Sequence, residues 1–408
     1  MVRVCIGKNL PPLPHNRQCF WFGLHCGGEG WGEGATLLAP SPSPRPSPHS
    51  HVFPESHAAS GERGQKHATA YHSDVYTNGH SLRHQDVEVL ATIPATQFKR
   101  DDVAREYAKI KARFGTPDNV IIDGAVELRD SVSVLESEGI TPRIFRDPKH
   151  FLANKLEALL KKDTDYEAFA KQIGSTRCAL QQTELAHFTP PPFKTKARFM
   201  NLQPTIAWAA AVLWHLNHPE SESCREVPRD RLEEKLGWLR PFADGLAQWQ
   251  ACQNVISTTL TFVNQRGLFQ GVVAAYQHLV ADIATCPASQ HLVTEMTTLL
   301  RNYEQQLKLG ERVPLSTEIL ESSFALYKQL EGQHSKSGFT NLLLSFPTLL
   351  RETTAAEVIA CFAAVKVADI KAWTKDHFPH TLTSKRQRMY QAAKPTPKKR
   401  ATPVSHAA

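Results

Sequence analysis

Hydrophobic positions in the middle of the chain alternate between two periodicities. Short apolar runs rich in β-branched residues predict buried strands at 87–93 (VEVLATI), 119–123 (NVIID) and 142–147 (PRIFRD). Between and after these runs, apolar positions recur every three or four residues, which predicts helices at 100–114, 126–138 and 151–160. Alternating strands and helices are typical of a parallel α/β sheet.

From residue 165 onward the pattern is mostly helical, without an internal repeat. The same spacing predicts further helices at 167–173, 204–217, 229–244, 247–309 with breaks, 318–328, 340–350 and 355–373. The chain therefore divides into a low-complexity lead (1–81), the first part of an α/β core (82–165), a helical insertion (166–310), the last part of the core (311–375) and a basic tail (376–408).

The lead does not carry the pattern of a folded domain. GGEGWGEG (27–34) and PSPSPRPSP (40–48) are rich in Gly, Pro and Ser. They lack the apolar periodicity that would offset the entropy of ordering the chain. We therefore expect residues 1–81 to be largely disordered.

The net charge of +7 is concentrated at the C-terminal end. No acidic residue follows Asp376, and the tail carries Lys385, Arg386, Arg388, Lys394, Lys398, Lys399 and Arg400. Such an arm suits phosphate backbones through counterion release, and a solvated tail is the alternative.

Composition also bears on the compartment. No apolar run reaches the roughly 18 residues that a membrane span needs, so we expect no membrane partner. The eight cysteines are scattered without a C-x-x-C pair, which favours a reducing cytoplasm over a disulfide framework or a zinc site.

Two aspartates end predicted strands, where ligands gather in parallel sheets. Asp123 ends NVIID, and it is a candidate metal ligand or the N-cap of the next helix. Asp147 precedes Pro148, and Pro at the first helical position favours an N-cap role for this aspartate.

Two charged residues in the predicted helix 318–328 are seven positions apart. Glu321 and Lys328 therefore lie on nearly the same helix face, yet they are too distant for an ordinary ion pair between neighbouring turns. They are either residues of a solvated face or a carboxylate for a metal ion and a cation for a phosphate.

A basic stretch interrupts the helical part. Lys194, Lys196 and Arg198 alternate with Phe193 and Phe199. Cations interleaved with aromatic rings suit a nucleic-acid strand, and a basic surface loop is the alternative.

Four segments in order carry a family resemblance: IIDGAVELRDSV, IFRDPKHFLANKLEALLK, LQQTELAHFTPPPFKTKARFMN and STEILESSFALYKQLEGQHSKSGFTNLLLS. From about Leu82 to about Leu350 the chain resembles bacterial insertion-sequence transposases of the DDE type. Its most specific piece is Glu-x6-Lys, although Pro314 and Thr317 stand where one large group of these transposases has tyrosine and arginine. The resemblance implies an α/β fold with an RNase H-like mixed sheet flanked by helices.

The resemblance also implies roles for individual residues. Asp123 would be the second acid of the catalytic triad and Glu321 the third, with Glu318 as the alternative. Two Mg²⁺ ions held by these carboxylates would clamp the attacking and leaving oxygens of a DNA phosphodiester. Lys328 would contact phosphate at the transposon end, and the basic stretch would lie in the helical insertion. The partners would be transposon ends and target DNA in the cytoplasmic nucleoid, and a homodimer is compatible with this.

The family needs a first aspartate on the first strand of the sheet. Upstream of 87–93 the chain holds PSPSPRPSPHSHVFPESH, whose prolines would remove the hydrogen bonds of a central strand. Asp74 is the nearest upstream acid with β-prone neighbours. We therefore expect a replaced amino terminus and a transposase that has lost catalysis. An intact transposase that uses Asp74, and a non-catalytic protein that binds DNA through 193–198 and the tail, are the alternatives.

Overall fold

The structure is a computed structural model of the chain. It describes residues 18–27, 63–72, 82–95, 99–115, 117–123, 142–192, 202–218, 220, 228–333, 346, 350, 354–377 and 382–393. The predicted helices at 126–138 and 340–350 lie largely or wholly outside these residues.

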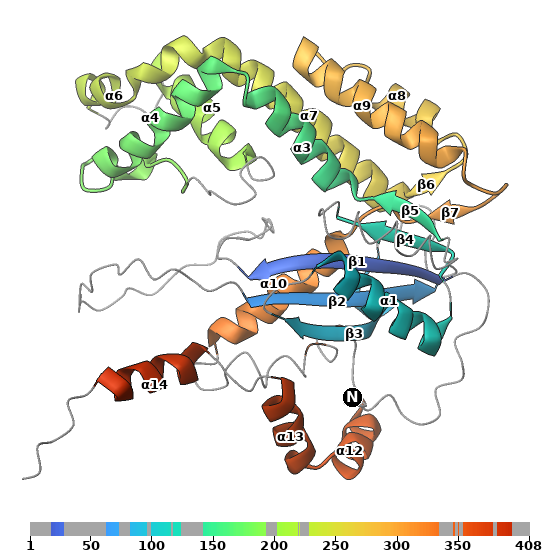
Figure 1. Cartoon of the computed structure of the whole chain (residues 1–408). Coiled ribbons are helices and arrows are strands. Elements are labelled where there is room, and N and C mark those ends of the chain that lie inside the picture. The colour runs from blue at the N-terminus through green and yellow to red at the C-terminus, as the bar shows by residue number, and fades with distance from the viewer. Residues whose placement is uncertain are drawn as a thin grey trace, which may run out of the picture.

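A five-stranded mixed sheet lies at the centre of the molecule (Figure 1). Its strands are β1 (Gln18–Gly27), β2 (Arg63–His72), β3 (Val87–Ala95), β4 (Asn119–Ile122) and β5 (Arg143–Arg146), in the order β3-β2-β1-β4-β5. The pairs β1–β2 and β2–β3 are antiparallel, whereas β1–β4 and β4–β5 are parallel. The chain is therefore an α/β protein whose sheet is mixed.

The position of β1 corrects our expectation for the lead. We expected no central strand before residue 87, yet β1 is the central strand and β2 lies beside it. The segment QCFWFGLHCG is an apolar and aromatic run of the kind that forms strands, and the Gly- and Pro-rich sequence after it obscured this signal. Asp74 lies outside the described residues.

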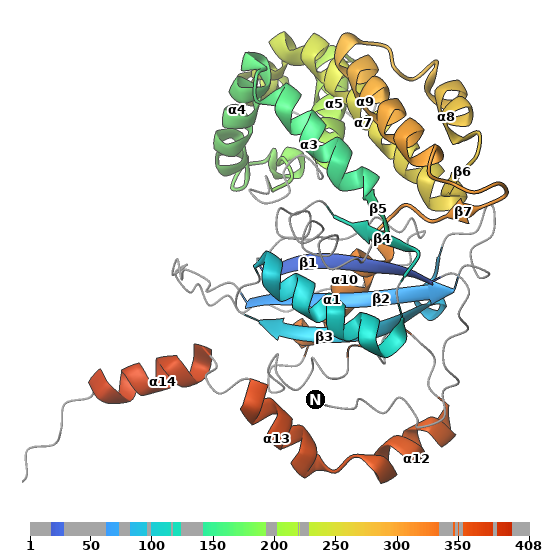
Figure 2. The same ribbon diagram turned by 45° about the vertical axis from the view of Figure 1, so that its right-hand side comes forward.

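Each face of the sheet is covered by a different helix (Figures 1 and 2). Because side chains alternate along a strand, Val120 and Ile122 of β4 pack in one cluster with Tyr107 of α1 (Arg100–Phe114). Ile121 belongs to the larger cluster on the other face, which also contains Phe324 of α10 (Glu318–Gln333). The alternation in β4 thus directs its odd-numbered residues toward α10.

The helical insertion packs around α3 (Pro148–Leu160), which continues directly from β5 (Figure 1). Its other elements are η2 (Ala186–Phe188), η5 (Gly237–Phe242), α4 (Thr164–Leu180), α5 (Gln203–Asn217), α6 (Arg229–Leu236), α7 (Ala243–Arg266), α8 (Val272–Val280) and α9 (Pro287–Glu304). Phe169 and Trp249 pack with ring centroids 4.9 Å apart and join α4 to α7. β6 (Leu268–Phe269) and β7 (Arg312–Val313) form a two-stranded antiparallel sheet, and the chain continues from β7 to α10.

The C-terminal part differs in detail from the predicted helix 355–373. It forms two helices, α12 (Ala355–Ala364) and α13 (Val367–His377). A third helix, α14 (Leu382–Ala393), lies within the predicted basic tail. Among the helices of the described residues, none is both long enough and apolar enough to cross a bilayer.

Candidate functional site

Charged side chains gather where β4 and β5 end and α10 begins. The peptide N–H of Asp147 donates to the carbonyl of Ile122 at 2.8 Å, which brings the ends of the two strands together. Because β4 and β5 are parallel, the residues that follow them emerge at the same edge of the sheet. We call Asp123, Asp147, Lys149, His150 and Glu321 the carboxylate site.

Asp147 is the structural centre of this site and is 1% exposed. Its Oδ1 accepts hydrogen bonds from the backbone N–H groups of Lys149 at 2.7 Å and His150 at 3.2 Å, which confirms the predicted N-cap of α3. Its Oδ2 accepts from the N–H of Thr317 at 2.5 Å and from the Thr317 hydroxyl at 2.6 Å. Burial alone would raise the pKa of Asp147, but His150 and the Thr317 donors outweigh burial and lower it.

Glu321 faces two cationic side chains from the first turn of α3. Its Oε2 lies 2.5 Å from Lys149 Nζ, and its Oε1 lies 3.8 Å from His150 Nε2. The Glu321 and Lys149 side chains are 22% and 23% exposed, so this ion pair is largely shielded from water. Oε1 of Glu321 is buried and has no hydrogen-bond partner within the part of the chain that the structure describes.

Asp123 directly follows Ile122 at the end of β4 and is buried, at 9% exposure. It continues the alternation that directs Ile121 toward the face covered by α10. Its carboxylate acts electrostatically on His150, as does that of Glu321. Asp123 and Glu321, which are far apart in sequence, therefore both lie near the start of α3: Asp123 follows Ile122, whose carbonyl accepts from the N–H of Asp147, and Glu321 contacts Lys149.

The charges of the site are mutually compensating. For Lys149, burial disfavours the charged form, but the Glu321 carboxylate more than offsets it and the pKa is raised. Burial also opposes the charged form of His150, yet Asp147, Glu321 and Asp123 together raise its pKa. Burial raises the pKa of Glu321, and Lys149 and His150 only partly offset this. The pKa shifts therefore favour the charged forms of Lys149, His150 and Asp147, whereas burial disfavours the ionised form of Glu321.

Contacts from two other segments hold the N-terminal part of α10 in place. His84, which precedes β3, shares a hydrogen bond with Ser322, with Nε2 and Oγ 2.8 Å apart. Asn264 of α7 donates a hydrogen bond to the carboxylate of Glu318, the alternative third acid. This bond joins the Glu318 side chain to the helical insertion. The apolar face of α10 is buried through Leu320, Phe324 and Tyr327.

A second ion pair anchors the segment that leads into α10. Arg143 at the start of β5 makes a two-pronged contact with Glu311, with one N–O distance of 2.7 Å. Glu311 also accepts from the N–H of Lys308 at 2.9 Å. This clamp lies just before β7, and it positions the residues that run from β7 to Thr317 against the end of β5.

The remaining predicted site residues lie on other parts of the described helices or outside the described residues. Lys328 lies in α10 two turns after Glu321, and the basic stretch with Lys194, Lys196 and Arg198 falls outside the described residues. Lys385, Arg386 and Arg388 lie in α14, where Arg386 and Arg388 are exposed.

The sequence analysis did not identify three residues that contact Asp147 or Glu321: Lys149, His150 and Thr317. Lys149 and His150 stand directly behind the Asp-Pro pair at the carboxyl end of a strand, which is a usable signal. We interpreted that segment only as a helix start. Thr317 had no local signal, because its role depends on contact with a residue that is 170 positions away.

The residues of the site do not fit a pair of Mg²⁺ ions. Both oxygens of Asp147 are taken by backbone or hydroxyl donors, and Oε2 of Glu321 is taken by Lys149. Within the described residues there is no group of three or more His, Cys, Asp or Glu side chains placed to share a metal ion. Two Mg²⁺ ions in such a site require several carboxylate oxygens that are free to bind them.

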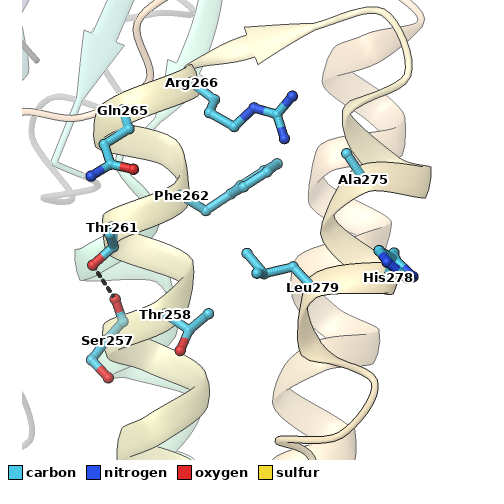
Figure 3. Close-up of a pocket in the computed structure, with 9 residues that line it drawn as sticks. All are labelled: Ser257, Thr258, Thr261, Phe262, Gln265, Arg266, Ala275, His278 and Leu279. Carbon is cyan, nitrogen blue, oxygen red and sulfur yellow. Dashed lines mark hydrogen bonds between the residues drawn. The ribbon is translucent and has the colours of Figure 1, made fainter. Parts of the chain in front are cut away.

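A groove of about 430 Å³ lies elsewhere, between α7 and α8. Phe262 and Arg266 project into it from α7, toward Ala275 and Leu279 of α8 (Figure 3). The rest of its lining is formed by Ser257, Thr258, Thr261, Gln265 and His278. None of these residues belongs to the carboxylate site.

The fold and the site together define an α/β protein with a helical insertion and a buried carboxylate cluster at the edge of its sheet. No protein-family model matches the chain, and no curated protein matches it. Among solved structures, the chain is similar to one titled Drosophila P element transposase strand transfer complex. The two are 10% identical, with a TM-score of 0.35, over 85% of this chain and 77% of that chain. This TM-score is too low to assign a shared fold.

Proposed function

We propose that this chain is a DNA-binding protein of the DDE transposase type, with an RNase H-like core that has lost strand-transfer chemistry. One observation carries the proposal: the N–H of Asp147 donates to the carbonyl of Ile122, which directly precedes Asp123, and Lys149 in the first turn of α3 contacts Glu321 of α10, so that both acids lie at this edge of the sheet. In such a core the second and third acids are distant in sequence and must lie close together in space. The order β3-β2-β1-β4-β5, with β1 parallel to β4, further supports it.

The proposed loss of chemistry rests on the composition of β1. In the family that the chain resembles, the first acid belongs to the first strand, beside the strand that ends in the second acid. Here β1 pairs Trp21 with Ile121 and Phe22 with Ile122, and residues 18–27 contain no Asp or Glu. The Mg²⁺ ions that two-metal phosphoryl transfer requires would lack one of their carboxylates.

The proposed DNA contacts are cationic side chains. Arg386 and Arg388 are exposed on α14, in a part of the chain without acidic residues. Lys194, Lys196 and Arg198 in the insertion and Lys328 on α10 are further candidates. An insertion-sequence origin, a nucleoid location and a homodimer stay predictions.

The test measures binding of the full chain to duplex DNA by fluorescence anisotropy over a range of salt concentrations. We expect the logarithm of the affinity to fall linearly with the logarithm of salt, because bound cations release counterions. Replacing Arg386 and Arg388 together by alanine should reduce the slope by about 2. The matched control replaces Lys161 and Lys171, which are exposed on the helical insertion, and should leave the slope unchanged.

The same protein is incubated with supercoiled DNA and Mg²⁺ to test for nicking. We expect no nicking above that of a Glu321→Gln variant, while both proteins bind DNA equally. Absence of salt-sensitive binding would refute the DNA-binding function. Mg²⁺-dependent nicking that disappears in Asp123→Ala would refute the loss of catalysis.

A further inference from the structure

The carboxylate site contains its own cations. Lys149 Nζ lies 2.5 Å from Oε2 of Glu321, and His150 lies between Glu321 and Asp147, at 3.8 Å and 3.5 Å from their nearest carboxylate oxygens. Asp123 also acts on His150. Three carboxyl groups therefore surround one ammonium and one imidazole, all largely buried.

We propose that Lys149 stands in the place of a divalent cation at Glu321, so that the site is neutralised from within and binds no divalent ion while Lys149 is present. The inference rests on the proposed function and extends it. It identifies Lys149 as the group that takes the position of a metal ion needed for strand transfer.

The distances support a direct replacement. A Mg²⁺–oxygen bond is about 2.1 Å long, so a cation bound to Oε2 of Glu321 would overlap the ammonium that now lies against this atom. The two charges would also repel each other in a site shielded from water. Lys149 and a divalent ion are therefore alternatives at this oxygen.

The backbone holds Lys149 in this position. Its N–H donates to Asp147 Oδ1 at 2.7 Å, and Asp147 is fixed in turn by two bonds from Thr317. Thr317 directly precedes α10, which carries Glu321. The segments that bear the lysine and the glutamate are thus joined through Asp147, which keeps the two side chains within reach of each other.

Removing the lysine would free Oε2 of Glu321 for a cation, in addition to Oε1. Oε1 of Glu321 is buried without a hydrogen-bond partner among the described residues, and Asp123 is a neighbour of the same imidazole. Replacing Lys149 by methionine would remove the ammonium and keep most of the apolar stem. The variant should then gain a site for a divalent ion.

The experiment titrates the full chain with Mn²⁺, a paramagnetic divalent probe, and measures free Mn²⁺ by electron paramagnetic resonance. We expect wild type to bind no more Mn²⁺ than Glu321→Gln does. Lys149→Met should bind at least about tenfold more tightly than wild type, a change of about 1.4 kcal/mol. The gain should vanish in the double variant Lys149→Met/Glu321→Gln, and it should be absent in Lys149→Arg, which keeps the charge.

Two results would overturn the proposal: Mn²⁺ binding by wild type that Glu321→Gln weakens, or a folded Lys149→Met variant without added affinity. Circular dichroism establishes whether each variant is folded. If Lys149→Met does not fold, the comparison of wild type with Glu321→Gln still decides. DNA binding by wild type is measured separately, so failure of the lysine proposal and failure of the DNA-binding function are distinguishable.

Discussion

Replacing Asp147 by alanine should destabilise the protein far more than loss of an ordinary helix cap. The change removes the N-cap of α3, which is worth about 1 kcal/mol. It also leaves the N–H and hydroxyl of Thr317 without their acceptor in a buried place, at about 1–3 kcal/mol for each unsatisfied donor. We therefore expect the free energy of unfolding to fall by about 3–7 kcal/mol.

Urea unfolding followed by circular dichroism measures this loss, with Thr354→Ala as the matched control. Thr354 caps α12 through a bond of 3.3 Å to the N–H of Glu357, but it is exposed and holds no distant segment. Its replacement should cost only about 1 kcal/mol. Equal losses in the two variants would refute the idea that Asp147 joins α3 to the segment before α10.

A double-mutant cycle with Thr317→Val isolates the long-range contact. Valine removes the hydroxyl that donates to Asp147 and keeps a similar shape. We expect the losses for Asp147→Ala and Thr317→Val to be non-additive by at least about 1 kcal/mol, because both remove the same hydrogen bond. Simple additivity would mean that this contact contributes nothing to stability.

Two further predictions concern the core and the pH dependence. Phe145→Ala should reduce the free energy of unfolding by about 3–5 kcal/mol, since its ring is fully buried, whereas Phe362→Ala, with 83% exposure, should change it by less than about 0.5 kcal/mol; urea unfolding compares the two. The raised pKa of His150 in the folded state means that its contribution to stability is complete below its ordinary value of 6.5 and is lost as pH rises through the folded value. Urea titrations from pH 6 to pH 9 should show this loss in wild type and not in His150→Gln, and identical pH profiles would contradict the assignment.

Several local features could be predicted from the sequence because they depend on neighbouring residues. The helix at 100–114 begins and ends where its apolar spacing and Gly115 place it, and this glycine adopts a φ of 91°. Asp147 was predicted to cap α3 because proline follows it, and both backbone bonds are present. By contrast, β1 was missed, since the surrounding Gly- and Pro-rich sequence outweighed its short aromatic run.

The sequence by itself determined where β3, β4, β5 and most of the described helices lie, and which acids stand at strand ends. Only the tertiary structure decided that β1 is the central strand, that Asp147 holds Thr317, and that Lys149 pairs with Glu321. The physical reason is the range of the interactions. Caps and amphipathic faces arise from residues a few positions apart, whereas strand order and buried ion pairs depend on which distant segments pack together and exclude water.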